Sequence, residues 1–183
     1  MPTWTRDPPA GTTGPGMRIV RTPTVGQLTG IITCPDIVGC ATHFYQRRTV
    51  PCETPNCDVC AAGIGWRWHG WVSCILASTQ EHVLFEMTAE GSEYLRRYRD
   101  TNISLRGCLF CASRVAPRPN ARVTIKTKPA DLAKITLPQP PDLMRALAHI
   151  WGIPPEQANI DGTQKTSPKI GVNRKLPIAQ PEE

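Results

Sequence analysis

The stretch HFYQRRTVPCETPNCDVC, residues 43–60, constrains the fold most, because it places one histidine and three cysteines within eighteen positions. These four residues are His43, Cys52, Cys57 and Cys60, and Cys3His is a donor set that structural zinc sites use. The Cys57-x2-Cys60 pair is the strongest part of the pattern, since a turn of that length directs two thiolates at one ion. The spacing therefore predicts a metal site.

The segment between these ligands has almost no apolar side chains, so hydrophobic burial alone would not fold it. Metal coordination can supply the missing free energy, on the order of 10 kcal/mol. Pro51, Pro55 and Asn56 favour turns next to the cysteines. We therefore predict that a structural zinc ion (Zn²⁺) orders this segment.

Other cysteines leave alternatives for the ligand set. Cys40 lies three residues before His43 and is an alternative fourth ligand. Cys108 and Cys111 form another C-x2-C, which could build a second site with Cys34 and Cys40. They lie in a strand-like run, however, and residues three apart on a strand point to opposite faces. Burial as small apolar side chains is the interpretation that we favour for this pair.

The predicted site has the composition of a structural centre and not of a catalytic one. A catalytic zinc keeps one coordination position open for water, whereas four protein ligands close this one. The sequence has no H-E-x-x-H motif and no H-x-E paired with P-C-x-x-C. Glu53 and Asp58 lie near the cysteines, but both have the setting of turn residues. We therefore expect a protein that is not an enzyme.

Five strand-like runs and one short helical pattern indicate a mainly β fold. The strand-like runs span residues 25–33, 65–76, 81–88, 105–115 and 121–128, and the helical pattern at 89–100 lies between the third and fourth of them. This is the element order of the OB-fold, a small five-stranded barrel. We predict an OB-like barrel with a zinc-binding insert after strand 1, a helix between strands 3 and 4, and a C-terminal helix.

The composition predicts one domain between two tails. Residues 1–16 and 155–183 are rich in proline and polar residues, and we expect both to be disordered. Between them we expect an OB-fold domain at 17–130, with its insert at 40–65, then a linker and C-terminal helix at 131–154. In that helix Leu143, Leu147, Ile150 and Trp151 form one apolar stripe, which predicts docking on the barrel.

The chain lacks the signals of export and membrane insertion. No apolar run approaches the ~18 residues of a membrane span, and the start MPTWTRDPPAGTTGPG has no apolar segment of the secretory type. We expect a cytoplasmic protein, of a bacterium or of a phage-infected host, without a membrane partner.

Positive charge and aromatic rings indicate a polyanionic partner. The formal charge is +6, and residues 96–134 hold ten Lys and Arg against two acids. The run GWRWHGWV adds three tryptophans. Cationic grooves with stacking rings are typical of single-strand binding. The candidate contact residues are Phe44, Tyr45, Arg47, Arg48, Trp66, Arg67, Trp68, Trp71, Arg106, Arg114, Arg122, Lys126 and Lys128.

The strand order and the His…Cys…Cys-x2-Cys insert after the first strand together resemble the single-stranded DNA-binding proteins of T4-type bacteriophages, over residues 25–128. The resemblance implies that the metal steadies a subdomain beside a DNA cleft. It also implies binding without sequence preference, in replication or recombination of a phage or mobile element, with replication or recombination proteins as further partners. By position, it assigns the four metal ligands above and the aromatic residues of 44–45 and 66–71 to that site.

Two other functions remain open at this point. Single-stranded RNA would be bound by the same rings and cations, since contacts to the 2′-hydroxyl leave no pattern in the sequence. A protein–protein adaptor would instead use the zinc loop and the C-terminal helix as docking surfaces. We expect single-stranded DNA as the partner.

Overall fold

The apolar runs form the strands of one mixed sheet in the computed structural model, which describes residues 17–53 and 55–153. The two tails predicted at 1–16 and 155–183 lie outside the described residues. The elements follow in the order β1 (Ile19–Val20), β2 (Gln27–Ile32), β3 (Val38–Tyr45), β4 (Arg48–Pro51), α1 (Asp58–Ala61), β5 (Arg67–Leu76), β6 (His82–Thr88), α2 (Ala89–Asn102), β7 (Cys108–Arg114), β8 (Val123–Pro129), η1 (Leu132–Lys134) and α3 (Leu143–Trp151).

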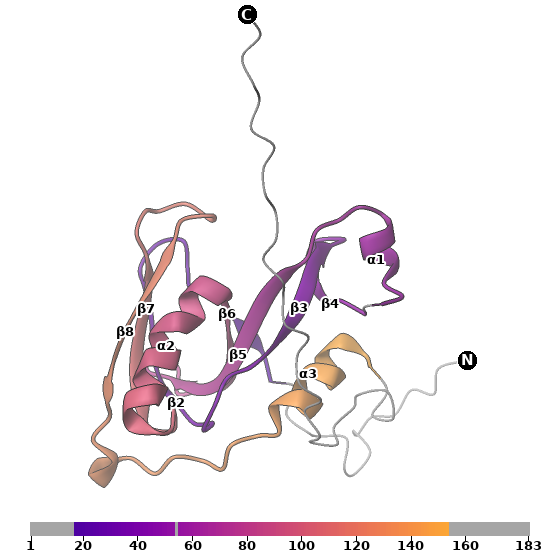
Figure 1. The fold of residues 1–183 in the computed structure, drawn as a ribbon. Coiled ribbons are helices and arrows are strands. Elements are labelled where there is room, and N and C mark those ends of the chain that lie inside the picture. Colours follow the sequence, from indigo (N-terminus) through magenta and orange to yellow (C-terminus); the bar gives the residue numbers. More distant parts are fainter. Residues whose placement is uncertain (1–16, 54, 154–183) are drawn as a thin grey trace, which may run out of the picture.

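The long strand β5 organises the sheet (Figure 1). Its second half pairs with β2, with Ile32 opposite Cys74, and its first half pairs with β3, with Val38 opposite Trp71. The chain between β2 and β3 is not a strand, and the two strands pair one after the other with the same edge of β5. β6 pairs along the other edge of β5, and β7 and β8 continue the sheet beyond β2.

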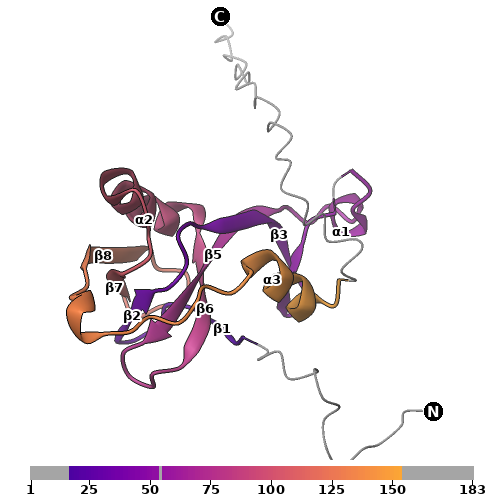
Figure 2. The same cartoon turned by 90° about the horizontal axis from the view of Figure 1, so that it is seen from below.

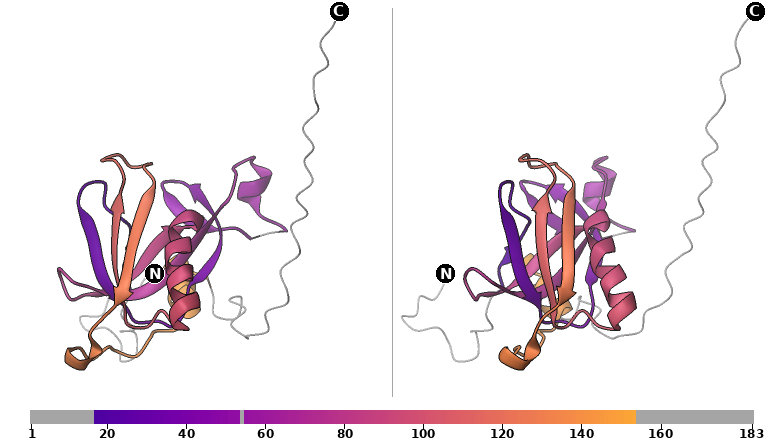
Figure 3. Two further views of the ribbon diagram at one scale, coloured as in Figure 1. Left: turned by 60° about the vertical axis from the view of Figure 1, so that its left-hand side comes forward. Right: turned by 90° about the vertical axis from the view of Figure 1, so that its left-hand side faces the viewer.

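The five-stranded barrel is not confirmed, because the sheet has eight strands in the described residues and does not close. Closure would require β8 to pair with β6. The outer edge of β6 is instead occupied by β1, which pairs with it in parallel through Ile19 opposite Leu84. Helix α2 packs against β5, β6 and β8 and fills the space between the last two strands (Figure 3). The mainly β class and the helix between the third and fourth predicted runs are confirmed.

The core lies between α2 and the sheet. The rings of Phe85 and Phe110 stack there with centroids 4.9 Å apart, and Val72 and Leu95 are fully buried beside them. Such aromatic pairs contribute about 0.5–1.5 kcal/mol beyond the area that they bury. The packed strands therefore give the molecule a core that does not depend on the metal-ligand segment.

The C-terminal helix covers the other face of β5 (Figure 2). Alternation along the strand turns Trp71 away from Val72, and its ring meets Trp151 of α3 edge-on at 5.3 Å. Leu143 and Leu147 are buried as expected, whereas Ile150 is 37% exposed and is not part of the packed stripe. No helix among the described residues is long and apolar enough to cross a membrane.

Helix α2 ends at a strained residue. Ile103 is the C-cap, with a left-handed φ of 67°, and its side chain is 93% exposed. This conformation costs an L-residue on the order of 1 kcal/mol, while glycine adopts it freely. We expect Ile103→Gly to raise the free energy of unfolding by about 0.5–1 kcal/mol and Tm by a few degrees, measured by thermal denaturation. Ile103→Ala keeps the strain and is the control; equal Tm values for the two variants would contradict this account.

Candidate functional site

A two-stranded hairpin carries the metal-ligand segment away from the rest of the sheet (Figure 1). Strands β3 and β4 are joined by Gln46 and Arg47, both with left-handed φ values of 48° and 65°. Two consecutive left-handed residues form the type of turn that matches the twist of a tight hairpin. We call β3, β4 and the segment up to Trp66 the arm. The predicted insert 40–65 is thus built on two strands and a helical turn that the sequence analysis did not predict.

The arm brings the four predicted ligands together. His43 comes from β3, opposite Val50 of β4, and Cys52 follows the end of β4. Cys57 precedes the single turn of α1 and Cys60 lies within it, which places both thiols on one side of the turn. The ligand atoms of the four residues all lie within 4.8 Å of one another.

The spacing of these atoms fits one tetrahedral ion. The Sγ atoms of Cys52 and Cys60 are 3.6 Å apart, and Nε2 of His43 lies 3.4 Å from the Sγ atoms of both Cys57 and Cys60. A tetrahedron with metal–sulfur bonds of ~2.3 Å and metal–nitrogen bonds of ~2.05 Å has edges of about 3.8 Å and 3.6 Å. The cluster could therefore hold a metal ion with only small adjustments of the side chains.

Contacts around the ligands orient them and shift their pKa values in different directions. His43 is 1% exposed, and its Nδ1 lies 3.3 Å from the carbonyl oxygen of Gly65, which leaves Nε2 to face the cysteines. Hydrogen bonds from the backbone at Cys60 and Glu53 lower the pKa of Cys57 to about 6. The thiolate, which is the form that ligates, is therefore favoured at Cys57 near neutral pH. The hydrogen bond with Cys52, together with burial, instead raises the pKa of Cys60 to about 11.

The structure decides between the alternative ligand sets. His43, and not Cys40, belongs to the cluster; Cys40 pairs with His69 across β3 and β5. Within the described ranges this is also the only such cluster. Cys108 is fully buried, and Cys111 on the other face of β7 donates to the side-chain oxygen of Gln27. A second site at this C-x2-C is therefore not formed.

The predicted nucleic-acid contacts divide into separate groups. One group lies exposed on the arm, with its rings and guanidinium groups spread over both faces of the hairpin and the start of β5. Phe44 is 67% exposed, Trp66 is 55% exposed and Tyr45 is 38% exposed. We call this group the arm patch; its members are Phe44, Tyr45, Arg47, Arg48, Trp66 and Arg67.

Two of the tryptophans are occupied by packing, which corrects the expectation for them. Trp71, expected among the accessible rings, is fully buried against α3. Trp68 is half-buried, and a side chain on Gly70 would meet its ring at 2.5 Å. The guanidinium of Arg96 lies 5.2 Å from the centroid of the Trp68 ring. Trp71 therefore packs β5 against α3, and Trp68 packs β5 against α2.

The cations predicted on the last two strands do not join the arm patch in a single groove. Lys126 and Lys128 are exposed on β8, at the opposite end of the molecule from the arm (Figure 1). Arg122 pairs with Glu90 at 2.6 Å. The guanidinium groups of Arg106 and Arg114 donate to backbone carbonyls, those of Thr33, Leu137 and Pro138 and that of Ala121 respectively.

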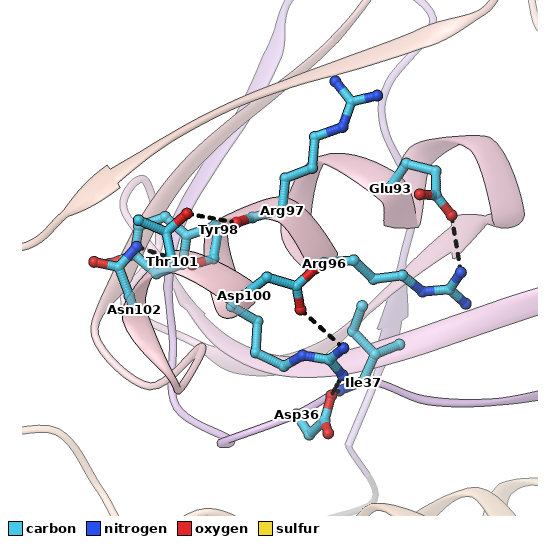
Figure 4. Close-up of polar contacts among 10 residues, drawn as sticks. Asp36, Ile37, Glu93, Arg96, Arg97, Tyr98, Asp100, Thr101 and Asn102 are labelled. Atoms are coloured by element: carbon cyan, nitrogen blue, oxygen red, sulfur yellow. Dashed lines mark hydrogen bonds and ion pairs between the residues drawn. The ribbon is translucent and has the colours of Figure 1, made fainter.

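The basic run of α2 is also largely neutralised. Arg96 pairs with Glu93 at 2.8 Å, and Arg99 pairs with Asp36 at 2.7 Å and with Asp100 at 3.2 Å (Figure 4). Most of the local positive charge that the sequence concentrates in residues 96–134 is therefore committed to contacts within the fold or placed far from the exposed rings.

A cleft of about 870 Å³ lies beside the arm, a feature that the sequence analysis missed. Its walls come from the arm, from the segment after β1, from β6 and from the end of α3. In its lining Arg21 forms a two-point ion pair with Glu86, at 2.9 and 3.0 Å. These two residues are 65 positions apart, so no local pattern could have joined them.

No protein-family model, curated protein or solved structure matches this chain. The site is thus defined by its own geometry: a four-residue cluster that could hold a metal ion, exposed rings and arginines on the arm, and a cleft beside it.

Proposed function

We propose that the protein binds single-stranded DNA through its arm, which a structural zinc ion holds in place. The observation that carries this proposal is the arm patch, where three exposed aromatic rings lie among three exposed arginines. Bases stack on such rings with about 1–3 kcal/mol per base, and arginines neutralise the phosphates.

Zinc is the ion that the donor set favours. Three thiolates and one imidazole at tetrahedral spacing are typical of structural zinc, whereas magnesium and calcium take oxygen ligands. The ion would tie β3 to the turn of α1 and to Cys52, and so fix the hairpin on which the patch is displayed. All four positions are filled by side chains, so no coordination site is left for a substrate, which supports binding and not catalysis as the function.

Binding without sequence preference follows from the same features. Every base offers a face for stacking, and the arginines contact phosphates that all sequences share. Single strands fit these features better than a duplex, because the bases of a duplex are stacked on one another and leave no face for the exposed rings. The basic helix α2 has two of its arginines, Arg96 and Arg99, in ion pairs.

Titration of the full chain with a dT oligonucleotide at two salt concentrations tests the proposal. Stacking on Trp66 should quench tryptophan fluorescence, and the affinity should fall as salt rises. A preference for the matching U oligonucleotide would assign the function to RNA instead. Absence of binding at low salt would overturn the proposal in favour of a protein–protein adaptor.

A further inference from the structure

The lining of the cleft includes a guanidinium that is held in a fixed position. Arg21 donates from Nε and Nη2 to Glu86, and from Nη2 also to Oγ1 of Thr49 at 2.7 Å. The side chain of Glu86 is only 4% exposed, whereas that of Arg21 is 51% exposed. A buried carboxylate thus anchors an arginine that faces the cleft. Since Arg21 makes no hydrogen bond through Nη1 among the described residues, two of its donors remain for a ligand.

The wall opposite the arm is apolar and aromatic. Ile150, Trp151 and Ile153 line it from the end of α3, and Ile19 lines it from β1. Trp151 is held by its edge-on contact with Trp71, so its ring has a fixed position at the cleft. Together with Tyr45 of the arm, the cleft therefore has two rings of the kind on which a base can stack.

Further charges line the mouth of the cleft. Arg47 and Arg48 lie on the arm side, and Glu53 and Asp58 belong to the metal-ligand segment. Since Glu86 is paired with Arg21, the remaining charges of the lining are Arg47, Arg48 and these two acids of the arm, while the wall from α3 is apolar and aromatic. The volume of about 870 Å³ is within the range of small-molecule sites, about 300–1,000 Å³.

We propose that this cleft takes an unstacked nucleotide of the bound strand. The base lies against Trp151 and Tyr45, and the phosphate accepts hydrogen bonds from the Nη1 group of Arg21 and from Arg48. A planar ring with an attached anion matches both walls, whereas a purely apolar ligand would leave the arginines unused. This inference rests on the proposed function, because it assigns a subsite to the strand that the arm binds; the subsite shares Tyr45 and Arg48 with the arm patch.

Titration of the full chain with dTMP, followed by NMR of the indole and arginine side-chain N–H groups, tests this subsite. We expect a saturable shift of the Trp151 indole signal and of the Arg21 Nε signal. Ile150→Glu places a carboxylate at the cleft wall and should weaken dTMP binding at least about tenfold by charge repulsion. Met144→Glu is the matched control: it changes an exposed apolar residue of the same helix, 43% exposed, outside the cleft lining, and should leave binding unchanged.

The outcomes separate this inference from the proposed function. If dT oligonucleotides bind but dTMP shifts neither Trp151 nor Arg21, or Ile150→Glu binds as the wild type does, the subsite is wrong and the arm alone binds the strand. If neither dTMP nor the oligonucleotide binds, both proposals fail. Weakening by Ile150→Glu but not by Met144→Glu supports the cleft, provided that both variants keep the wild-type Tm.

Discussion

Replacing Cys57 with serine is expected to release the metal and unfold the arm while the rest of the sheet stays folded. Cys57 is buried and its Sγ lies 3.4 Å from Nε2 of His43, so the substitution removes one corner of the cluster. The segment around the cluster has few apolar contacts of its own. Loss of coordination therefore removes on the order of 10 kcal/mol from the local folding free energy.

Metal analysis and hydrogen exchange measure this effect. We expect zinc to be absent from the Cys57→Ser variant and amide protection to be lost across β3 and β4, with protection retained in β6 and β7. Cys111→Ser is the matched control, because Cys111 lies outside the cluster and a serine hydroxyl can donate to Gln27 as the thiol does. Unchanged protection of the arm in the Cys57→Ser variant would contradict a structural role for the metal.

Replacing Arg47 and Arg48 together with alanine is expected to weaken single-strand binding at least about tenfold at low salt, since each charge-assisted hydrogen bond contributes about 1.5–3 kcal/mol. Both side chains are exposed at the tip of the arm, so the fold should not change. Two lost phosphate contacts also reduce the slope of log K against log salt by about 1.4 for a single strand.

Lys126→Ala with Lys128→Ala provides the comparison for this variant. It removes the same number of exposed cations, but from β8 at the far end of the molecule (Figure 1). Anisotropy titrations at several salt concentrations should show a reduced slope for the arm variant alone. A reduced slope for the β8 variant, with the arm variant unaffected, would place the binding surface on β7 and β8.

Local patterns in the sequence were sufficient for much of the fold. Alternation of apolar residues identified the runs that became β2, β5, β6, β7 and β8, and the spacing of apolar residues identified α2 and α3. The strands of the arm were not predicted, because cysteines and arginines interrupt the pattern of β-forming residues in this segment. The signal was present in VGCATHFY, which is rich in β-branched and aromatic residues, but the turn Gln46-Arg47 lacks the usual asparagine or glycine.

Long-range pairing explains what the sequence could not predict. Closure of the barrel depends on which strand pairs with the outer edge of β6. That strand is β1, and a strand of two residues is too short to give a periodic pattern in the sequence. The metal ligands were predictable because their spacing is local. The cleft was not, because the tertiary fold brings Arg21, Glu86 and Trp151 together from three distant segments.

The central claim, that a metal-held arm binds single strands, is tested most directly by one titration in three states of the wild-type protein: as purified, stripped by a chelator, and reloaded with zinc. A dT oligonucleotide at low salt is the ligand, with zinc content measured in each state. We predict one zinc ion per chain, strong quenching and binding in the first state, loss of both after stripping, and recovery on reloading. Equal affinity in the stripped protein would contradict the account, since the arm would then bind without the metal that is proposed to hold it.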